Sequence, residues 1–433
     1  MAVTITQQPQ SPNAAFGTLV YVVSGSSSLT LPQYQFVIDV QDENKTILSR
    51  LRQYPNPSGY GVIDVANIVS DYLTVTPTFA VGPGFQSVGV RGDNATNKVF
   101  RIAFGEEYGT SISSSVTIYN GKGSAGAPGV SGSNQIIFSA VNEPQVDKWD
   151  DLQFLTASRM SNNPLGLTEA TAIPFDQEDF GSISFLNGVG NYGGGQQLVG
   201  NVVATVYNAA GSVLKTGTIG TGSGKVGSKV DIGVGPRNIG YVDSAWYAVM
   251  DGQWNSIKNW KVVVNYTIGG VAGAKTYWFE RNDCNYYEWN SEFNFVNRYG
   301  AWDFYKVNYP FIQNTAVKRD IWTQPRVNYS TTTGQAGLDP FRRGTQQYYT
   351  SYEDTFSTTT PPLSEDEADY LTQLMESQNV FWTVKQDFID YKIPEPIIIT
   401  NSNYTWWTNP RGQKLFQFTF EWKSANQRRA RTS

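Results

Sequence analysis

Apolar and polar side chains alternate along much of this chain, and a period of two residues indicates β-strands with one buried face. The pattern first occurs over residues 34–40, followed by a polar turn at 42–45 and a returning strand at 47–54. The alternation is most regular near the end of the chain, at residues 415–422. Further strands are predicted at residues 99–104, 115–119, 202–207, 213–219, 260–268, 274–279, 380–384 and 397–400. The sequence therefore predicts a mainly β fold.

Two segments carry a helical period instead. Asp64 is a candidate N-cap, and the apolar residues after it, up to Leu73, recur three and four positions apart. Ser364 and Glu367 form a capping box ahead of a second apolar face, which predicts a helix that ends near residue 377.

A run rich in Gly and Ser at residues 121–134 divides the chain and predicts a linker. Residues 1–120 before it are expected to form a β-sandwich-like domain. Residues 135–280 repeat the order strand, turn, strand, Gly-rich loop and apolar/Asp segment, which predicts a second β-sandwich-like domain. Residues 281–433 combine strands with the predicted helix, so we expect an α+β C-terminal docking domain.

The composition excludes several kinds of chemistry. The 433 residues include no His and one Cys. Without His there is no Ser-His-Asp triad, Cys-His dyad or His-ligated metal. A single Cys excludes an intrachain disulfide and a thiolate zinc site. The net charge of −5 argues against a dedicated nucleic-acid binder. We expect no enzymatic activity, with no catalytic residue, cofactor-binding residue or metal ligand.

Carboxylates that lie close in sequence are the one remaining candidate for catalysis, because a glycosidase needs a pair of them. Asp176, Glu178 and Asp179 form one such group, and residues 365–367 form another. The second group falls in the first turn of the predicted helix, where the helix dipole favours negative charge. Nothing in the sequence separates an acid from a nucleophile, so a structural role is favoured for both groups.

The N-terminal residues have neither a basic stretch nor an apolar core of a secretory signal, so we expect none. No run of 18 apolar residues occurs, so we expect no membrane span. Charged residues make up 16% of the chain, below the ~25% of ordinary domains. A virion protein, which folds in the host cytoplasm and works outside it, reconciles these observations.

The chain has 12 Trp, 25 Tyr and 23 Phe, and most of these rings are expected in cores and interfaces. Trp406 and Trp407 are adjacent on a predicted strand, so their side chains point to opposite faces and cannot share one core. The basic C-terminal tail is expected to contact an acidic neighbouring subunit or solvent. The candidate interface residues are Trp302, Trp406, Trp407, Arg428, Arg429 and Arg431.

Several segments together resemble a group of poorly characterised virion proteins of tailed bacteriophages. These segments are residues 5–9 (ITQQP), 32–39 (PQYQFVID), 53–65 (QYPNPSGYGVIDV), 295–304 (FVNRYGAWDF) and 364–429. The resemblance covers most of the chain, and its motifs are turns, caps and core aromatics. It implies a structural role in the virion, in the tail. It implies no catalytic residues, since the group defines none.

The sequence therefore predicts a structural component of the phage tail, in the hub, baseplate or fibre-attachment region, that forms homo-oligomers and docks to other virion tail proteins. The aromatic clusters keep a second function open, a receptor-binding fibre protein that recognises host surface glycan. A third, less favoured function is a polysaccharide depolymerase that acts through a carboxylate pair.

Overall fold

The protein is mainly β, with a few short helices. A computed structural model describes the chain over the following residues: 3–9, 13–25, 31–75, 90–93, 95–108, 130–137, 173–188, 197–224, 228–282, 291–297, 300–307, 310–338, 344–363, 365–385, 392–408 and 414–426. Internal contacts divide the chain into two units. The first contains Met1–Cys284 and Asn294–Phe304, and the second contains Asn285–Phe293 and Tyr305–Ser433.

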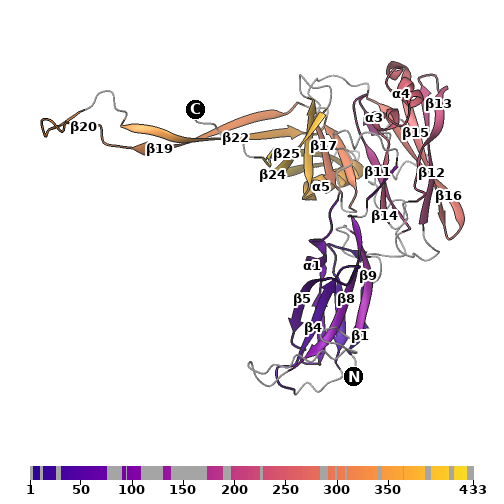
Figure 1. Ribbon diagram of the computed structural model, residues 1–433. Helices are drawn as coiled ribbons and strands as arrows, with labels where there is room; N and C mark the ends of the chain where they lie inside the picture. Colours follow the sequence, from indigo (N-terminus) through magenta and orange to yellow (C-terminus); the bar gives the residue numbers. More distant parts are fainter. Residues whose placement is uncertain are drawn as a thin grey trace. The chain divides into compact units, whose positions relative to one another are not determined.

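The N-terminal part of the first unit has two sheets (Figure 1). One sheet has the order β1 (Thr4–Gln7), β3 (Val20–Ser24) and β6 (Tyr60–Asp64). The other has the order β2 (Asn13–Ala14), β9 (Val130–Ile137), β8 (Asn97–Glu107), β4 (Gln35–Gln41) and β5 (Ile47–Gln53). Both sheets contribute side chains to one core, which includes Tyr21, Val23, Phe36, Ile38, Ile102 and Phe104.

The remainder of the first unit repeats this arrangement with a second pair of sheets. The larger sheet has the order β10 (Ile173–Phe175), β16 (Val271–Arg281), β15 (Ile257–Ile268), β12 (Gln197–Asn208) and β13 (Val213–Thr221). The smaller has the order β11 (Ser182–Asn187), β14 (Ser228–Gly233) and β7 (Val90–Asp93). Two short helices, α3 (Pro236–Gly240) and α4 (Ser244–Met250), and a 3₁₀ turn (Trp254–Ser256) follow β14.

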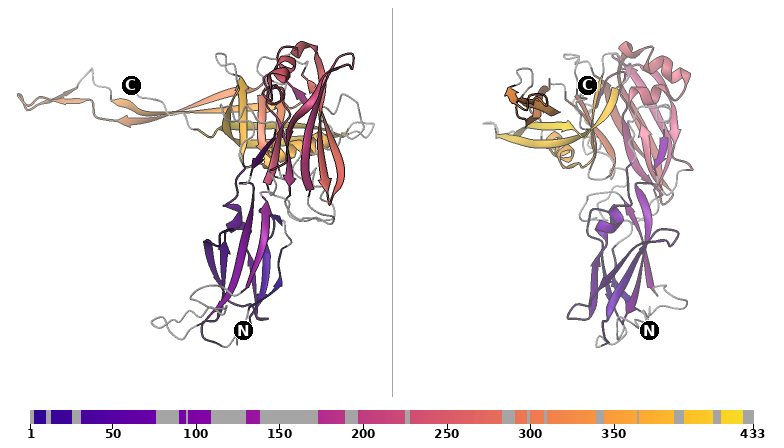
Figure 2. Two further views of the ribbon diagram at one scale, coloured as in Figure 1. Left: turned by 45° about the vertical axis from the view of Figure 1, so that its right-hand side comes forward. Right: turned by 60° about the vertical axis from the view of Figure 1, so that its left-hand side comes forward.

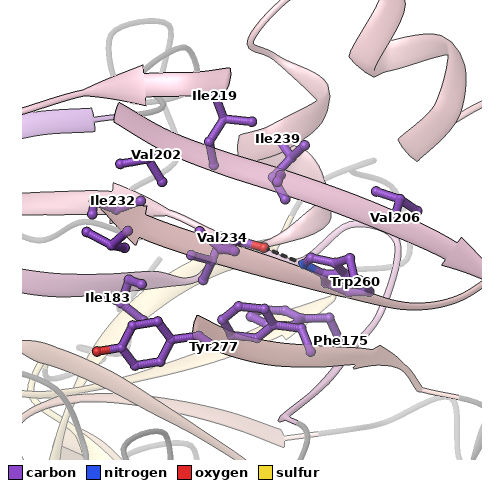
Figure 3. Close-up of a cluster of buried hydrophobic side chains, with 14 of the residues drawn as sticks. Phe175, Ile183, Val202, Val206, Ile219, Ile232, Val234, Ile239, Trp260 and Tyr277 are labelled. Carbon is purple, nitrogen blue, oxygen red and sulfur yellow. Dashed lines mark hydrogen bonds between the residues drawn. The ribbon is translucent and has the colours of Figure 1, made fainter. Parts of the chain in front are cut away.

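Trp260 lies in the core between these two sheets (Figure 3). Its ring nitrogen Nε1 donates a hydrogen bond of 3.0 Å to the carbonyl oxygen of Val234. Its ring packs against Phe175 and Phe279, with centroids 5.7 and 5.9 Å away. The indole of Trp260 is thus surrounded by apolar rings and has an acceptor for its N–H. With that acceptor, burial of Trp260 does not leave an unpaired polar group in the core.

A further sheet has seven strands, and most of its residues belong to the second unit. Its order is β18 (Trp302–Val307), β17 (Ser291–Val296), β23 (Val380–Lys385), β24 (Lys392–Thr408), β25 (Lys414–Ser424), β22 (Thr345–Thr359) and β19 (Ile312–Thr323). Helix α5 (Glu365–Glu376) packs on β25 and buries Leu371 and Leu374. The short strands β20 (Val327–Tyr329) and β21 (Ala336–Leu338) pair only with each other in the described chain.

Most predicted strands that lie within the described residues are confirmed, including three hairpins. Strands β4 and β5, β12 and β13, and β15 and β16 pair as antiparallel neighbours. Gly269 and Gly270 join the last pair with positive φ angles of 56° and 85°, as a two-residue hairpin turn requires. The strand predicted at 115–119 lies outside the described residues.

Two predictions differ from the structure. The predicted linker at 121–134 overlaps strand β9, which begins at Val130 and pairs with β8. The Gly and Ser residues of this segment favour a flexible linker, but backbone pairing to a neighbouring strand needs no particular side chain. The predicted helix after Asp64 is shorter than its apolar spacing indicated. It covers only Ala66–Ser70 (α1), with Asp64 Oδ1 accepting from the N–H of Ala66 at 3.0 Å.

A buried carboxylate joins β4 to the edge strand β5. Asp39 is 0% exposed, and both of its oxygens accept hydrogen bonds from Arg50, from Nε at 2.6 Å and from Nη2 at 2.7 Å. A bidentate pair of this kind is strong, and removing one partner leaves the other without its counter-charge.

We predict that Asp39→Asn lowers the free energy of unfolding by about 2–4 kcal/mol, since the amide cannot accept both guanidinium bonds. Glu107→Gln is the matched control, because Glu107 pairs with Arg52, whose side chain is 49% exposed. The control is expected to cost less than about 1 kcal/mol. Urea unfolding of the full chain measures both, and equal losses would contradict the importance of burial.

Asp303 in β18 is a second buried carboxylate, and its hydrogen-bond donor is a neutral amide, that of Asn297. Burial raises the pKa of Asp303 from 3.8 to about 7, against the opposing effect of a hydrogen bond from Asn297 Nδ2 at 2.8 Å. The unfolded chain therefore releases this proton at lower pH than the folded chain does.

We predict that stability falls as the pH rises from about 4 to about 7 and then levels off, by about 4 kcal/mol in all from this group. Asp303→Asn, which keeps an oxygen to accept from Asn297, is expected to remove that slope. Asp71→Asn, at an exposed carboxylate, is expected to leave it in place. Thermal unfolding between pH 4 and 8 measures the slope, and an unchanged profile in Asp303→Asn would refute its origin.

Candidate functional site

The most distinctive feature of the second unit is a long two-stranded arm formed by β19 and β22 (Figures 1 and 2). Residues 355–359 of β22 pair with β25 inside the sheet, whereas residues 345–354 pair only with β19 within the described residues. At about 3.3 Å per residue, that second part extends about 33 Å beyond β25. The strands β20 and β21 continue it to the tip. We call residues 312–338 and 344–354 the arm.

The arm is held at its base by packed aromatic rings. Phe356, on β22, lies with its ring centroid 4.7 Å from that of Trp382 and 5.8 Å from that of Trp422. Phe311, just before β19, is 5.2 Å from Trp382 in an edge-to-face arrangement. Trp422 is fully buried and also contacts Phe293 at 5.0 Å. Both strands of the arm therefore leave the sheet from one rigid aromatic cluster.

Beyond this base, the arm exposes apolar side chains. Every residue of β19 is exposed except Asp320, which is partly exposed. Ile321 is 64% exposed and Trp322 is 53% exposed. The exposed large apolar residues of the arm are Ile312, Val317, Ile321, Trp322, Val327, Tyr329, Leu338 and Tyr352. Apolar surface gathered on one projecting element is typical of a protein interaction site.

The tip carries its apolar residues on one face. Val327 pairs with Leu338 and Tyr329 pairs with Ala336, and positions two apart on a strand share a face. Leu338 is 75% exposed. A hairpin of three residues per strand cannot bury this face against itself, so the tip presents it to solvent or to a partner.

Charged residues lie in the middle of the arm and at its base. Lys318, Arg319 and Asp320 are consecutive at the centre of β19. At the base, Lys423 Nζ lies 2.8 Å from Glu353 Oε1 on the surface. Thr315 Oγ1 donates to Asp354 Oδ1 at 2.6 Å between β19 and β22. The backbone ladder and the contact between Thr315 and Asp354 hold β19 and β22 in register.

The residues predicted from sequence to form an interface are not gathered into this site. Trp302 is buried, with 4% exposure, so the expectation that it faces a partner does not fit the structure. The neighbouring aromatic side chains that the structure describes, Phe293, Phe295, Phe304 and Tyr305, are buried as well. Trp406 and Trp407 lie on β24 as expected, paired with Phe416 and Leu415, while their rings fall outside the described side chains. Arg428, Arg429 and Arg431 lie outside the described residues.

The arm itself was missed in the sequence because it lacks the signal that identifies strands. The segment from Ile312 to Thr323 has no continuous apolar face, since no side of it is buried along its length. The available signal is the high content of Thr and Tyr in residues 345–359, because both residue types favour strands even where no apolar period is present.

The acidic cluster of the first unit has structural roles. Asp179 Oδ2 accepts from the N–H of Asp176 at 2.7 Å, and Asp176 Oδ1 accepts from Asn282 Nδ2 at 2.9 Å. Glu178 accepts hydrogen bonds from Arg237. Burial alone would lower the pKa of Arg237, but the hydrogen bond and charge of Glu178 raise it. The guanidinium is therefore neutralised from within the chain.

A small hollow adjoins this guanidinium, lined by Gln177, Tyr241, Tyr247, Met250 and Asp251 among others. Its volume of about 10 Å³ corresponds to roughly one water molecule. It is too small to enclose a sugar ring or a nucleotide.

A buried polar group lies on β14. Lys229 Nζ is 3.0 Å from Asp231 Oδ1, and Ser184 Oγ donates to the same oxygen at 2.6 Å. All three side chains are buried, so a substrate has no access to them. Within the described ranges, no three Asp, Glu or Cys side chains come together in a way that could hold a metal ion.

None of the helices that the structure describes is long and apolar enough to cross a membrane. No protein-family model matches the sequence, and no curated protein matches it.

Two of the solved structures that match the chain show how weak the similarity is. One is Salmonella α2-macroglobulin reacted with methylamine, with 10% identity over 99% of this chain and 20% of that one, at a TM-score of 0.18. The chain thus spans about a fifth of that protein. The other is invasin, a bacterial integrin-binding protein, with 10% identity over 96% of this chain and 73% of that one, at a TM-score of 0.23. Scores this low do not define a shared fold.

We predict that the arm contributes little to the stability of the second unit, whereas its base is essential. Ile321→Ser and Trp322→Ser are expected to change the free energy of unfolding by less than about 0.5 kcal/mol, because both side chains are exposed. Trp422→Ala is expected to cost about 3–5 kcal/mol through the cavity it leaves. Urea unfolding compares them, and a large loss in either serine variant would show that the arm packs on its own unit.

Proposed function

We propose that this protein is a structural component of a tailed-bacteriophage virion, in the hub, baseplate or fibre-attachment region of the tail. In this proposal it self-assembles and docks to neighbouring virion proteins, and the arm is its docking element. The observation that carries the proposal is the arm's exposed apolar surface on β19, β20, β21 and β22. The resemblance of the sequence to tail-associated virion proteins supports the location.

The fold is interpreted in the same terms. We regard the two pairs of sheets in the first unit as β-sandwich-like domains, because each pair encloses one apolar core. The seven-stranded sheet with α5 and the arm is then the α+β docking domain. In this division the first unit is a rigid spacer, and the second unit makes the contacts with partner proteins.

The arm has no second layer to pack against over the part beyond β25 in the described chain. A two-stranded hairpin is marginally stable in water on its own. Its apolar side chains gain burial only against another molecule, at roughly 25 cal/mol per Å² of apolar surface. The arm also contains more residues than the roughly 20–30 that a standard interface places on one side.

Absence of enzymatic activity belongs to the proposal as well. The acidic cluster at Asp176 and Asp179 is engaged in hydrogen bonds within the chain, and the Lys229 group is closed to solvent. A structural protein of a symmetric assembly needs interaction surfaces that repeat in every copy, and it needs no reactive centre.

The location can be tested by mass spectrometry of purified particles of the phage that encodes the chain. We expect the intact chain in particles at a stoichiometry that matches a symmetric tail ring or fibre set. Absence from particles, with the protein present in the infected lysate, would refute the proposal.

We further predict that the double variant Tyr329→Ser with Leu338→Ser lowers incorporation into particles at least about tenfold, since each buried apolar side chain contributes roughly 1.5–3 kcal/mol. The matched control is Val271→Ser, at a residue that is 72% exposed at the start of β16. The control is expected to incorporate normally. Equal incorporation of both variants would show that the arm is not the docking element.

A further inference from the structure

Strand β19 ends its sheet and leaves one edge open. It is last in the order of the seven strands, and its only strand partner in the described chain is β22. Its twelve residues, Ile312–Thr323, contain no Pro. The register shift at Asp320 and Ile321 places the extra residue on β22, so β19 itself runs without a bulge. A long, regular and exposed edge of this kind is a template for pairing with another strand.

The centre of β19 is complementary to itself when reversed. Residues 317–321 read Val, Lys, Arg, Asp, Ile. In an antiparallel pair of two such strands centred on Arg319, Lys318 lies opposite Asp320 of the other copy, and Asp320 lies opposite Lys318. Val317 lies opposite Ile321 in the same way. Opposite charges and apolar pairs directly across an antiparallel ladder are the stabilising combinations.

The geometry of a sheet allows this register. Two identical antiparallel neighbours in one sheet are related by a two-fold axis perpendicular to the sheet, and such an axis keeps equivalent faces on one side. Facing residues must therefore both be odd or both be even in number. The pairs 317 with 321 and 318 with 320 meet this condition, and Arg319 lies on the axis facing its own copy.

The two faces of the pair would differ in character. Val317 and Ile321 of both copies share one face with Tyr352, which lies opposite Val317 on β22. All three are exposed in the single chain, so the pairing buries apolar surface that is otherwise in water. Lys318 and Asp320 form the ion pairs on the other face. The single unfavourable contact is between the two Arg319 side chains, which is screened by solvent and salt.

We infer that the outer edge of β19 pairs antiparallel with β19 of a second copy of this chain, with the two-fold axis at Arg319. This inference rests on the proposed function in one respect: it names a partner for the arm that we propose as the docking element. In this register residues 315–323 of the two copies face each other within β19. Nine residues a side is below the 20–30 of a standard interface, so one pair is weak alone. Several copies held together in an assembly raise its effective concentration and strengthen it.

The test uses the full chain with Cys284→Ser, which leaves no other thiol. Arg319→Cys in this background places two cysteines opposite each other, with Cα atoms roughly 4.5–5.5 Å apart, within the range of a disulfide. Mild oxidation is expected to trap a disulfide-linked dimer. The background chain should unfold at the same temperature as the wild type, which shows that the fold is retained.

Val317→Cys in the same background is the matched control. In the inferred register, two residues 317 are offset by about 13 Å along the strands, too far for a disulfide. We expect at least about tenfold less dimer than with Arg319→Cys. A mixture of Val317→Cys and Ile321→Cys chains should crosslink to each other. Equal dimer from Arg319→Cys and Val317→Cys, or none from either, would overturn the inference.

Charge reversal tests the register independently of thiol chemistry. Lys318→Asp in the Arg319→Cys background places two like charges opposite each other twice and is expected to reduce the trapped dimer. Adding Asp320→Lys to the same chain restores opposite charges and should restore the dimer. Failure of the double reversal to rescue the dimer would refute the assigned pairs.

These results separate the inference from the proposed function. If Arg319→Cys does not crosslink while the Tyr329 and Leu338 variant still loses incorporation into particles, self-pairing is wrong and docking to another protein stands. If the crosslink forms as expected but the chain is absent from particles, the pairing stands and the proposed function is wrong.

Discussion

The structure of the second unit depends on strand β22, because one continuous strand serves two different environments. Residues 355–357 are paired on both sides, by β19 and by β25, and the ring of Phe356 packs on Trp422. Within the described chain, residues 345–354 pair with β19 alone. A backbone paired on one side must satisfy its other groups with water or with another chain. The packed base therefore makes an otherwise marginal hairpin persist, and the hairpin in turn presents unpaired backbone and apolar side chains.

An open edge of this length is a hazard unless something limits what can pair with it. Proteins protect such edges with charges, bulges or Pro. On β19 the protection is the group Lys318, Arg319 and Asp320, which any strand without matched charges would have to desolvate. The same charges satisfy one another when the strand meets its own copy in reverse. These three charged residues thus disfavour pairing with strands of other sequence and favour one register with a second copy. Specificity of this kind is a difference in affinity between the right partner and the wrong ones.

The sequence predicted the elements whose pattern follows from burial. Strands β4, β5, β12, β13, β15 and β25 were found because each has apolar positions that face a core, and α5 was found from its capping box and apolar face. The arm has no buried face along its length, so no period marks it. The start of β9 has the composition of a linker. Its Gly and Ser residues nevertheless form a strand, because β8 supplies the backbone pairing. Partner-dependent structure leaves little trace in a single sequence.

The tryptophans show the same division between a core and an interface. Trp260, Trp246 and Trp422 are buried in the single chain, and Trp302 joins them despite its place in an aromatic stretch that resembled an interface in sequence. Trp322 is different, because it is 53% exposed on β19, a strand on which no residue is buried. An abundance of aromatic residues thus says little about binding until the backbone shows which of them lack a core. Here that criterion moves the candidate site from Trp302 to the arm.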